Sequence, residues 1–207
     1  MDADRCWDNI FDRGRTLTYR KDQPIFLKGG QRGCVLRVVE GWALVTDPHP
    51  DGRRAFLELR GRGQLLGETS ALTGGQRNAD VTAVCRTTVR AVNGDRFAAE
   101  LRRSDDLIGV LLRAHESHRK ANLRVGLRSF GVVNGLSRLL LDLAGTAGAP
   151  LVAGIPQKVL AYALGVTPRT LYEAVAELER RGAVSVSWPV IGLTDETVLR
   201  GLAHSDE

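Results

Sequence analysis

The stretch that most constrains the fold is residues 160–188, LAYALGVTPRTLYEAVAELERRGAVSVSW. Its first part predicts a helix that ends at Gly165. Thr167 can cap a second helix, and Pro168 suits the first turn of that helix because this position needs no backbone donor. An alternating apolar run and a proline turn over 184–191 predict a short β-hairpin. Two helices joined by a tight turn and followed by a hairpin are typical of a winged helix-turn-helix.

The predicted second helix has two different faces. Leu171, Val175 and Leu178 recur at three- and four-residue spacing, so we expect them to form one buried stripe. A helix has the diameter to enter the major groove of DNA. From these residues alone, an αα-hairpin that only packs is the alternative. The candidate DNA-binding residues, at the cap and on the opposite face, are Thr167, Arg169, Thr170, Tyr172, Glu173 and Arg180.

The formal net charge of +5 favours a nucleic-acid partner, but its location matters. From residue 151 onward five basic residues stand against seven acidic ones, a local balance of −2. We therefore expect modest non-specific DNA affinity, since that affinity comes from neutralised phosphates. A dimer doubles the contacts.

Several protein classes are disfavoured by the composition. No apolar run approaches the roughly 20 residues of a membrane span, and no signal peptide is visible, so we expect a cytoplasmic protein without membrane contact. The three cysteines are widely spaced and form no Cys-x-x-Cys pair, so no metal site is predicted. No nucleophile and base are arranged for catalysis, so we predict no catalytic residues and no enzyme activity.

The first half of the chain has the sequence pattern of a β protein, with short apolar or alternating runs separated by turn residues. Many short strands at this spacing predict a sandwich or barrel. The apolar or alternating runs are 16–19, 24–27, 35–39, 42–46, 55–59, 82–85 and 89–92.

One segment within this β region, residues 67–81, does not alternate. We expect a short helix to begin at Gly67, where free backbone donors form a candidate anion site. Glu68 can accept hydrogen bonds from sugar hydroxyls, and Arg77 can fork onto a phosphate. The segment suits a phosphorylated sugar; a surface turn with a Glu–Arg ion pair is an equally weighted alternative.

Residues 105–128 carry apolar side chains every three or four positions, the pattern of a long helix with a narrow apolar seam. Such a helix usually pairs with a copy of itself, so we predict a parallel homodimer. Residues 131–135 indicate a hinge. The predicted domains are an effector domain at 1–104, a dimerisation helix at 105–131 and a winged helix-turn-helix DNA-binding domain at 132–207.

This order of parts resembles the CRP/FNR family of bacterial transcription regulators, over nearly the whole chain. The resemblance implies an α+β fold. Its N-terminal β-barrel, a double-stranded β-helix or jelly roll of the cyclic-nucleotide-binding type, precedes a long dimerisation helix and a C-terminal winged helix-turn-helix domain. The motifs that carry the likeness are Pro24-Ile25-Phe26-x-x-Gly29, Val38-x-x-Gly41, Gly67-Glu68 with Arg77-Asn78-Ala79, Gly135 to Ala144, and Gly165 to Thr170.

The resemblance also implies roles for single residues. Glu68 takes the ribose hydroxyl and Arg77 the cyclic phosphate, assisted by the amides of Gly67 and Glu68. Two departures are visible: Asn78 stands where cyclic-AMP-binding members carry Ser or Thr, and Asp80 adds a negative charge nearby. The dimer-helix hydroxyls of such members have no clear counterpart at 120–122. The predicted ligand-binding residues are Gly67, Glu68, Thr69, Arg77 and Asn78.

In the predicted recognition helix, the positions that read the best-known operator of the family correspond to Pro168, Arg169 and Glu173. Arg169 can fork onto a guanine, and Glu173 can accept from a cytosine amine. Thr170 or Tyr172 can touch a base or a phosphate. We therefore expect a different operator.

These observations predict a homodimeric, effector-responsive DNA-binding transcription regulator, with a cyclic nucleotide such as cAMP as the candidate effector and no required cofactor. Double-stranded DNA, a second copy of the chain and RNA polymerase are the predicted partners. Three alternatives stay open: a regulator of the same fold with a vestigial pocket, a haem sensor that uses His115, His118 or a cysteine, and a nucleotide-binding regulatory subunit whose winged helix contacts protein.

Overall fold

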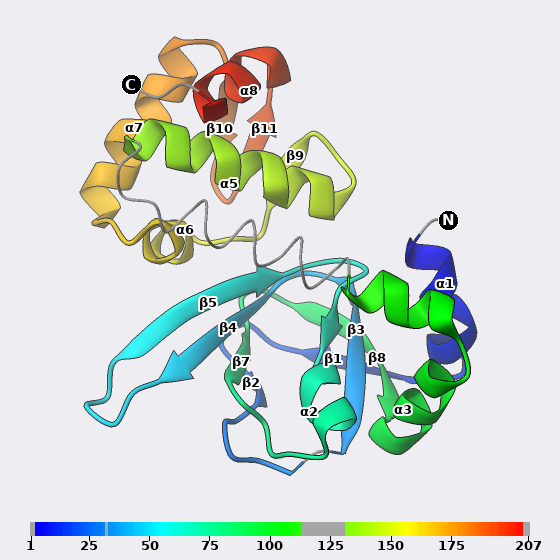
Figure 1. Cartoon of the computed structure of the whole chain (residues 1–207). Coiled ribbons are helices and arrows are strands. Elements are labelled where there is room, and N and C mark those ends of the chain that lie inside the picture. The colour runs from blue at the N-terminus through cyan, green and yellow to red at the C-terminus, as the bar shows by residue number, and fades with distance from the viewer. Residues whose placement is uncertain (1–2, 32, 113–130, 205–207) are drawn as a thin grey trace. The chain divides into compact units, whose positions relative to one another are not determined.

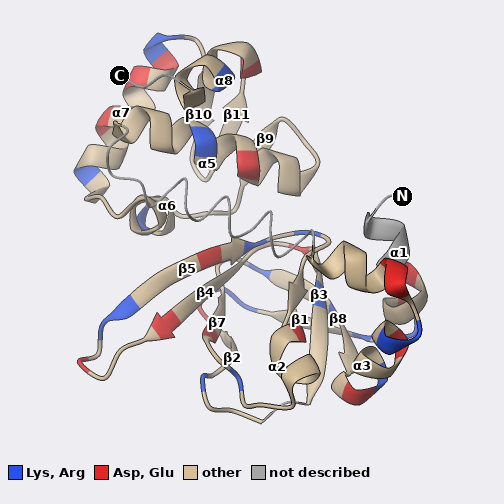
Figure 2. Ribbon diagram, viewed as in Figure 1, with Lys and Arg blue, Asp and Glu red and all other residues tan. Residues whose placement is uncertain are grey.

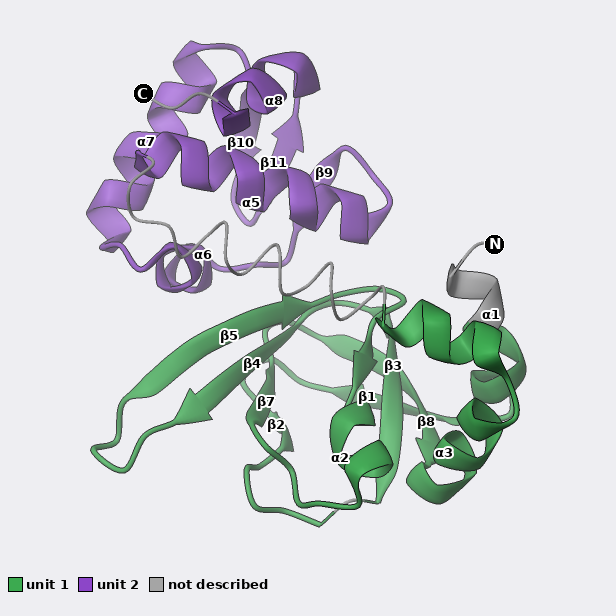
Figure 3. Cartoon of the chain, viewed as in Figure 1, with its two compact units in different colours: residues 1–118 green, residues 119–207 purple. Residues whose placement is uncertain are grey.

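The computed structural model describes residues 3–31, 33–112 and 131–204. The chain divides into two compact units, residues 1–118 and 119–207 (Figure 3). Both units mix helices with antiparallel strands. No helix in the described ranges is both long and apolar enough to cross a membrane.

The first unit is built on two four-stranded antiparallel sheets (Figure 1). One has the strand order β1-β8-β3-β6, and the other has the order β2-β7-β4-β5. Within the described residues the two sheets do not close into one continuous hydrogen-bonded barrel. The strands are β1 (Arg15–Tyr19), β2 (Pro24–Phe26), β3 (Cys34–Glu40), β4 (Ala43–Pro48), β5 (Arg54–Arg60), β6 (Leu65–Leu66), β7 (Asp80–Ala83) and β8 (Thr87–Asn93).

The alternating runs of the sequence account for most of these strands, with two differences. The short strand β6 lies outside the predicted runs. The strand predicted at 82–85 is β7, which begins at Asp80 and ends at Ala83. The chain then bends over 84–86, where the Thr87 hydroxyl donates to the carbonyl of Cys85. Side chains of both sheets, among them Leu36 and Val81, form the common core between the strands.

A second apolar cluster lies where helices cover one end of the β structure. Helix α1 (Ala3–Phe11) places Trp7 and Phe11 against Phe97 of α3 (Gly94–Arg102). The rings of Trp7 and Phe97 are stacked with centroids 5.9 Å apart. The cluster continues into the helical residues 105–112 through Val110 and Leu111. The remainder of the predicted dimerisation helix, with His115 and His118, lies outside the described residues.

Helix α2 (Glu68–Thr73) interrupts the β region as the lack of alternation predicts, although it begins one residue later than expected. Gly67 precedes the helix in the left-handed conformation, with φ 81°. A Cβ at this position would overlap with Nη1 of Arg77. The position therefore requires glycine both for its backbone and for its space.

The second unit is organised around two helices joined by a tight turn. Helix α6 (Gln157–Leu164) ends at Gly165, whose φ is 66°. Helix α7 (Pro168–Arg180) begins with Pro168 and is capped by the Thr167 hydroxyl, which accepts from the amide of Thr170 at 3.2 Å. The other elements are α5 (Val132–Ala147), β9 (Leu151–Ala153), β10 (Val184–Ser187), β11 (Val190–Leu193) and α8 (Glu196–His204).

The strands of this unit form one antiparallel sheet of order β10-β11-β9, in which β10 and β11 pair from Val184↔Leu193 to Ser187↔Val190. The prediction of a hinge over 131–135 is wrong for most of that segment. Helix α5 already begins at Val132, because the amide of Gly135 bonds to the carbonyl of Gly131 at 3.1 Å.

Candidate functional site

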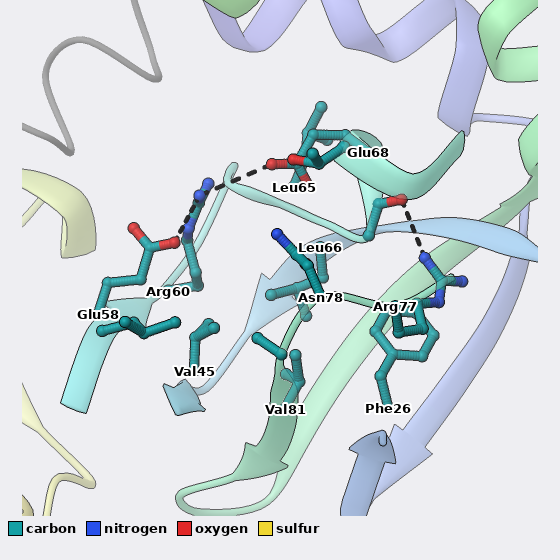
Figure 4. Close-up of a pocket in the computed structure, with 14 residues that line it drawn as sticks. Phe26, Val45, Glu58, Arg60, Leu65, Leu66, Glu68, Arg77, Asn78 and Val81 are labelled. Atoms are coloured by element: carbon teal, nitrogen blue, oxygen red, sulfur yellow. Dashed lines mark hydrogen bonds and ion pairs between the residues drawn. The ribbon is translucent and has the colours of Figure 1, made fainter. Parts of the chain in front are cut away.

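A pocket with a cavity volume of about 200 Å³ lies in the first unit, between α2 and the strands around it (Figure 4). Charged side chains and apolar side chains share its wall. Strands β5 and β6, the start of α2 and the loop before β7 supply most of them. The lining residues are Phe26, Val45, Leu57, Glu58, Arg60, Leu65, Leu66, Gly67, Glu68, Thr69, Arg77, Asn78, Ala79 and Val81.

All five predicted ligand-binding residues line this one pocket. Glu68 and Arg77 are buried, with exposed fractions of 4% and 5%, whereas Asn78 is exposed and Gly67 and Thr69 are half-buried. The structure thus brings together residues that are up to eleven positions apart in the sequence.

The guanidinium of Arg77 is held under the start of α2. Its Nη1 donates to the carbonyl of Gly67 at 2.9 Å and to the hydroxyl of Ser70 at 2.7 Å, and its Nη2 donates to the carbonyl of Cys34 at 2.6 Å. Its Cζ lies 3.8 Å from the centroid of the Phe26 ring, a cation–π contact. Burial lowers the pKa of Arg77, and the nearby charges of Cys34 and Glu68 oppose that shift.

The carboxylate of Glu68 faces a different arginine. Arg60 of β5 places its Nη2 3.7 Å from Glu68 and 2.7 Å from Glu58, so one guanidinium bridges two carboxylates (Figure 4). The alternative of a surface turn with a Glu–Arg ion pair is therefore wrong, because both groups are buried and the partner of Glu68 is Arg60.

Two buried side-chain nitrogens in the described residues have no hydrogen-bond partner, and both belong to this pocket: Nε of Arg60 and Nε of Arg77. A buried N–H without an acceptor is costly, so such groups usually meet an acceptor on a ligand or a water. Two residues of the pocket wall therefore carry a cationic donor without an acceptor, and two others carry carboxylates that can accept from hydroxyls.

Sequence reasoning missed Arg60, Ser70 and Phe26. Arg60 and Glu58 stand at alternate positions of β5, which is a usable signal, because alternate residues of a strand share a face. Charged residues in that pattern normally face solvent, so the pattern alone does not indicate a pocket. Asp80, by contrast, does not line it: its carboxylate accepts from the amide of Lys28 at 2.8 Å and lies 3.6 Å from Arg54.

The candidate DNA-binding residues gather at the start and along one side of α7. The predicted stripe of Leu171, Val175 and Leu178 is buried, as expected. Opposite it, Tyr172 is 64% exposed, and the exposed side chains of Arg169 and Glu173 form an ion pair at 3.0 Å. Figure 2 shows both basic and acidic segments along this helix.

Of the remaining candidates on α7, Thr170 is half-buried, and its hydroxyl lies 2.9 Å from the hydroxyl of Thr167. Arg180, in the last turn, is exposed and forms an ion pair with Glu177. Glu177 also binds Arg181 at 2.6 Å, so one carboxylate neutralises two arginines at this end. These arginines offer little unpaired charge to a phosphate in this arrangement.

The chain matches a known domain family and has curated relatives of similar length. Residues 16–104 match the family model of the cyclic nucleotide-binding domain. The cyclic AMP receptor protein of Thermus thermophilus is 28% identical over 190 residues, covering 89% of this chain and 86% of that protein. A CRP-like cAMP-activated global transcriptional regulator of Mycobacterium tuberculosis is 25% identical over 191 residues, covering 86% of this chain and 84% of that protein.

Solved structures share the fold at lower sequence identity. FixK2 from Bradyrhizobium japonicum superposes with a TM-score of 0.79 at 20% identity, covering 93% of this chain and 98% of that one. A CRP-family transcriptional regulator from Thermus thermophilus superposes with a TM-score of 0.73 at 21% identity, covering 91% of this chain and 97% of that one. The chain therefore shares the fold of these two structures.

Proposed function

We propose that this chain is a DNA-binding transcription regulator controlled by a cyclic nucleotide, because residues 16–104 match the cyclic nucleotide-binding domain and the curated relatives are a cyclic AMP receptor protein and a CRP-like regulator. The observation that carries this proposal is the placement of Glu68 and Arg77 in one pocket. One is a buried carboxylate and the other a buried guanidinium with a donor to spare.

The chemistry of the two groups matches the two polar parts of a cyclic nucleotide. A carboxylate accepts from the ribose hydroxyl, and a guanidinium binds the cyclic phosphate. In the pocket, Arg77 Nε is available for that phosphate, while Nη1 and Nη2 anchor the arginine to the backbone of Gly67 and Cys34. Thr69 and Asn78 line the same pocket and supply further polar contacts.

For the second unit we propose a winged helix-turn-helix, with α7 as the recognition helix and the β10–β11 hairpin as the wing. The exposed ion pair of Arg169 and Glu173 supports this role. Such an exposed pair contributes only about 0 to 1 kcal/mol, so it opens at little cost when a base edge replaces the partner. In that state Arg169 forks onto a guanine and Glu173 accepts from a cytosine amine.

The proposal includes a homodimer, with domains at 1–104, 105–131 and 132–207 and with the first unit as an N-terminal jelly-roll barrel. On the described part of the middle helix, Leu107 and Leu111 of the predicted seam pack inside the first unit. The partner surface we propose therefore runs through Ile108 and Leu112, which are exposed. A second copy sets two α7 helices about 34 Å apart on successive major grooves. The regulator acts in the cytoplasm and contacts RNA polymerase.

The test begins with selection of an operator from random double-stranded DNA, followed by affinity measurements at one fixed salt concentration. We expect Arg169→Ala to weaken operator binding by about 1–3 kcal/mol while leaving random DNA unchanged. Arg200→Ala is the matched control, because Arg200 is also exposed and pairs with a glutamate four residues away, at 2.9 Å, but lies on α8. Equal discrimination in the two variants contradicts the assignment of α7.

A further inference from the structure

We propose that Arg60 reads the base of the bound nucleotide and that the pocket selects guanine over adenine. This inference rests on the proposed function and names the base that the same pocket selects. It concerns a residue of β5, outside the Glu68 and Arg77 pair that the sequence indicates for the ribose and the phosphate.

Arg60 is a fixed cation in the pocket wall. Its exposed fraction is 7%, and both of its ion pairs, to Glu58 at 2.7 Å and to Glu68 at 3.7 Å, involve Nη2. The shorter contact holds the guanidinium in place, while Nε has no acceptor among the described residues. The arginine is therefore oriented by the protein and still has a buried donor to offer.

The two orphan donors lie on different sides of the same pocket. Figure 4 shows Arg60 and Arg77 at opposite sides, with Asn78, Leu66 and Val81 between them. A ligand that satisfies both arginines must carry acceptors at two separated places. A cyclic phosphate supplies the first, and either the ribose or the base can supply the second. We assign the base, because Glu68 is the residue proposed for the ribose hydroxyl.

The walls between the two arginines suit a flat, largely apolar ring. Val45, Leu65, Leu66 and Val81 line that part of the pocket. Ligand pockets typically combine such apolar walls with a few placed polar groups. A purine packed there presents its edge to the polar groups of the pocket wall, and Arg60 is the arginine on the side away from Arg77.

Guanine and adenine differ in the edge that an arginine would meet. Guanine presents two acceptors, O6 and N7, which can accept from Nε of Arg60 and from one further N–H of the same guanidinium. Adenine presents N7 together with an amino group, which is itself a donor, so one arginine donor is left without an acceptor. A bidentate match of this kind discriminates by roughly tenfold or more in affinity.

The experiment measures dissociation constants of the full chain for cyclic GMP and cyclic AMP by calorimetry. We expect cyclic GMP to bind about tenfold more tightly or better. Arg60→Gln should reverse the preference, because a glutamine amide pairs with adenine N6 and N7 instead. Arg53→Gln is the matched control: it makes the same change in charge on an exposed arginine, 86% exposed as a side chain, between β4 and β5.

A second variant separates base reading from folding. Arg60→Lys keeps a positive charge beside Glu58 and Glu68 but loses the planar fork, so it should fold and lose the guanine preference. Circular dichroism and a thermal melt verify the fold of each variant. If Arg60→Gln does not fold, Arg60→Lys decides the question.

Each contrary outcome has one meaning. Equal affinity of the native chain for the two nucleotides, or equal loss of both in Arg60→Lys, overturns guanine selection and leaves the cyclic nucleotide effector standing. Binding of neither nucleotide at millimolar concentration overturns the effector as well. The DNA-binding proposal is judged separately by Arg169→Ala.

Discussion

Replacement of Gly67 by alanine tests whether the buried guanidinium of Arg77 needs the space that Gly67 leaves at the start of α2. The residue has a φ of 81°, and a Cβ would overlap with Nη1 of Arg77 and lie 2.9 Å from the Phe26 ring. Neither contact is tolerable. In Gly67→Ala the guanidinium must therefore move, and it then gives up the bonds that Nη1 makes to Gly67 and Ser70.

The expected loss has two parts. A non-glycine residue in the left-handed conformation costs about 1 kcal/mol. The two hydrogen bonds of Nη1, at 2.9 and 2.7 Å, involve a buried charged donor and contribute about 1.5 kcal/mol each. We expect Gly67→Ala to lower the free energy of unfolding of the first unit by about 4 kcal/mol.

A second glycine, Gly52, measures the cost of the left-handed backbone conformation alone. Gly52, in the turn between β4 and β5, also has a φ of 81°, but nothing lies within 4 Å of a Cβ built there. Gly52→Ala should therefore lose only about 1 kcal/mol. The comparison separates backbone strain from displacement of Arg77, because the two glycines share one conformation.

Urea denaturation followed by tryptophan fluorescence measures both losses. In a Trp188→Phe background the two remaining tryptophans, Trp7 and Trp42, are buried in the first unit and report its unfolding alone. A Gly67→Ala loss no larger than that of Gly52→Ala would refute the reasoning, because it would mean that Arg77 does not depend on the space at Gly67.

Two smaller predictions follow. Asn93→Ala should lower the free energy of unfolding by about 1 kcal/mol in urea, because the Asn93 side chain caps α3 by accepting from the amides of Asp95 and Arg96 at 2.9 and 3.0 Å. Asp80→Asn should cost about 1 kcal/mol of stability by weakening the bond to the amide of Lys28. It should leave nucleotide affinity unchanged by calorimetry, since Asp80 does not line the pocket; a clear gain in affinity would show that its charge opposes the ligand.

The local signals in the sequence are sufficient for the two central helices of the second unit. Gly165 ends one helix, and Thr167 caps the next through a bond to an amide three residues on. The buried stripe follows from the spacing of Leu171 and Leu178, which are both fully buried. All of these interactions join residues within one or two turns, so their geometry is fixed by the helix itself.

The pocket can be predicted only in part, because its contacts are distant in sequence. The composition of the loop identifies Glu68 and Arg77 as candidate ligand-binding residues. It does not show that Glu68 forms its ion pair with Arg60. Arg77 donates to Cys34, 43 positions away, and Glu68 faces Arg60. Both partners depend on the way strands β3 and β5 are placed, which no spacing in the sequence specifies.

Asn78 and Asp80 both depart from the pattern of cyclic-AMP-binding members, but only Asn78 lines the pocket. On the sequence, Asp80 adds a negative charge beside the phosphate loop, yet its carboxylate is engaged by the amide of Lys28 and by Arg54 outside the pocket wall. Asn78 lines the pocket and keeps a donor there. Neither departure excludes a cyclic phosphate. We propose instead that ligand choice depends on Arg60, a buried cation whose Nε has no acceptor among the described residues.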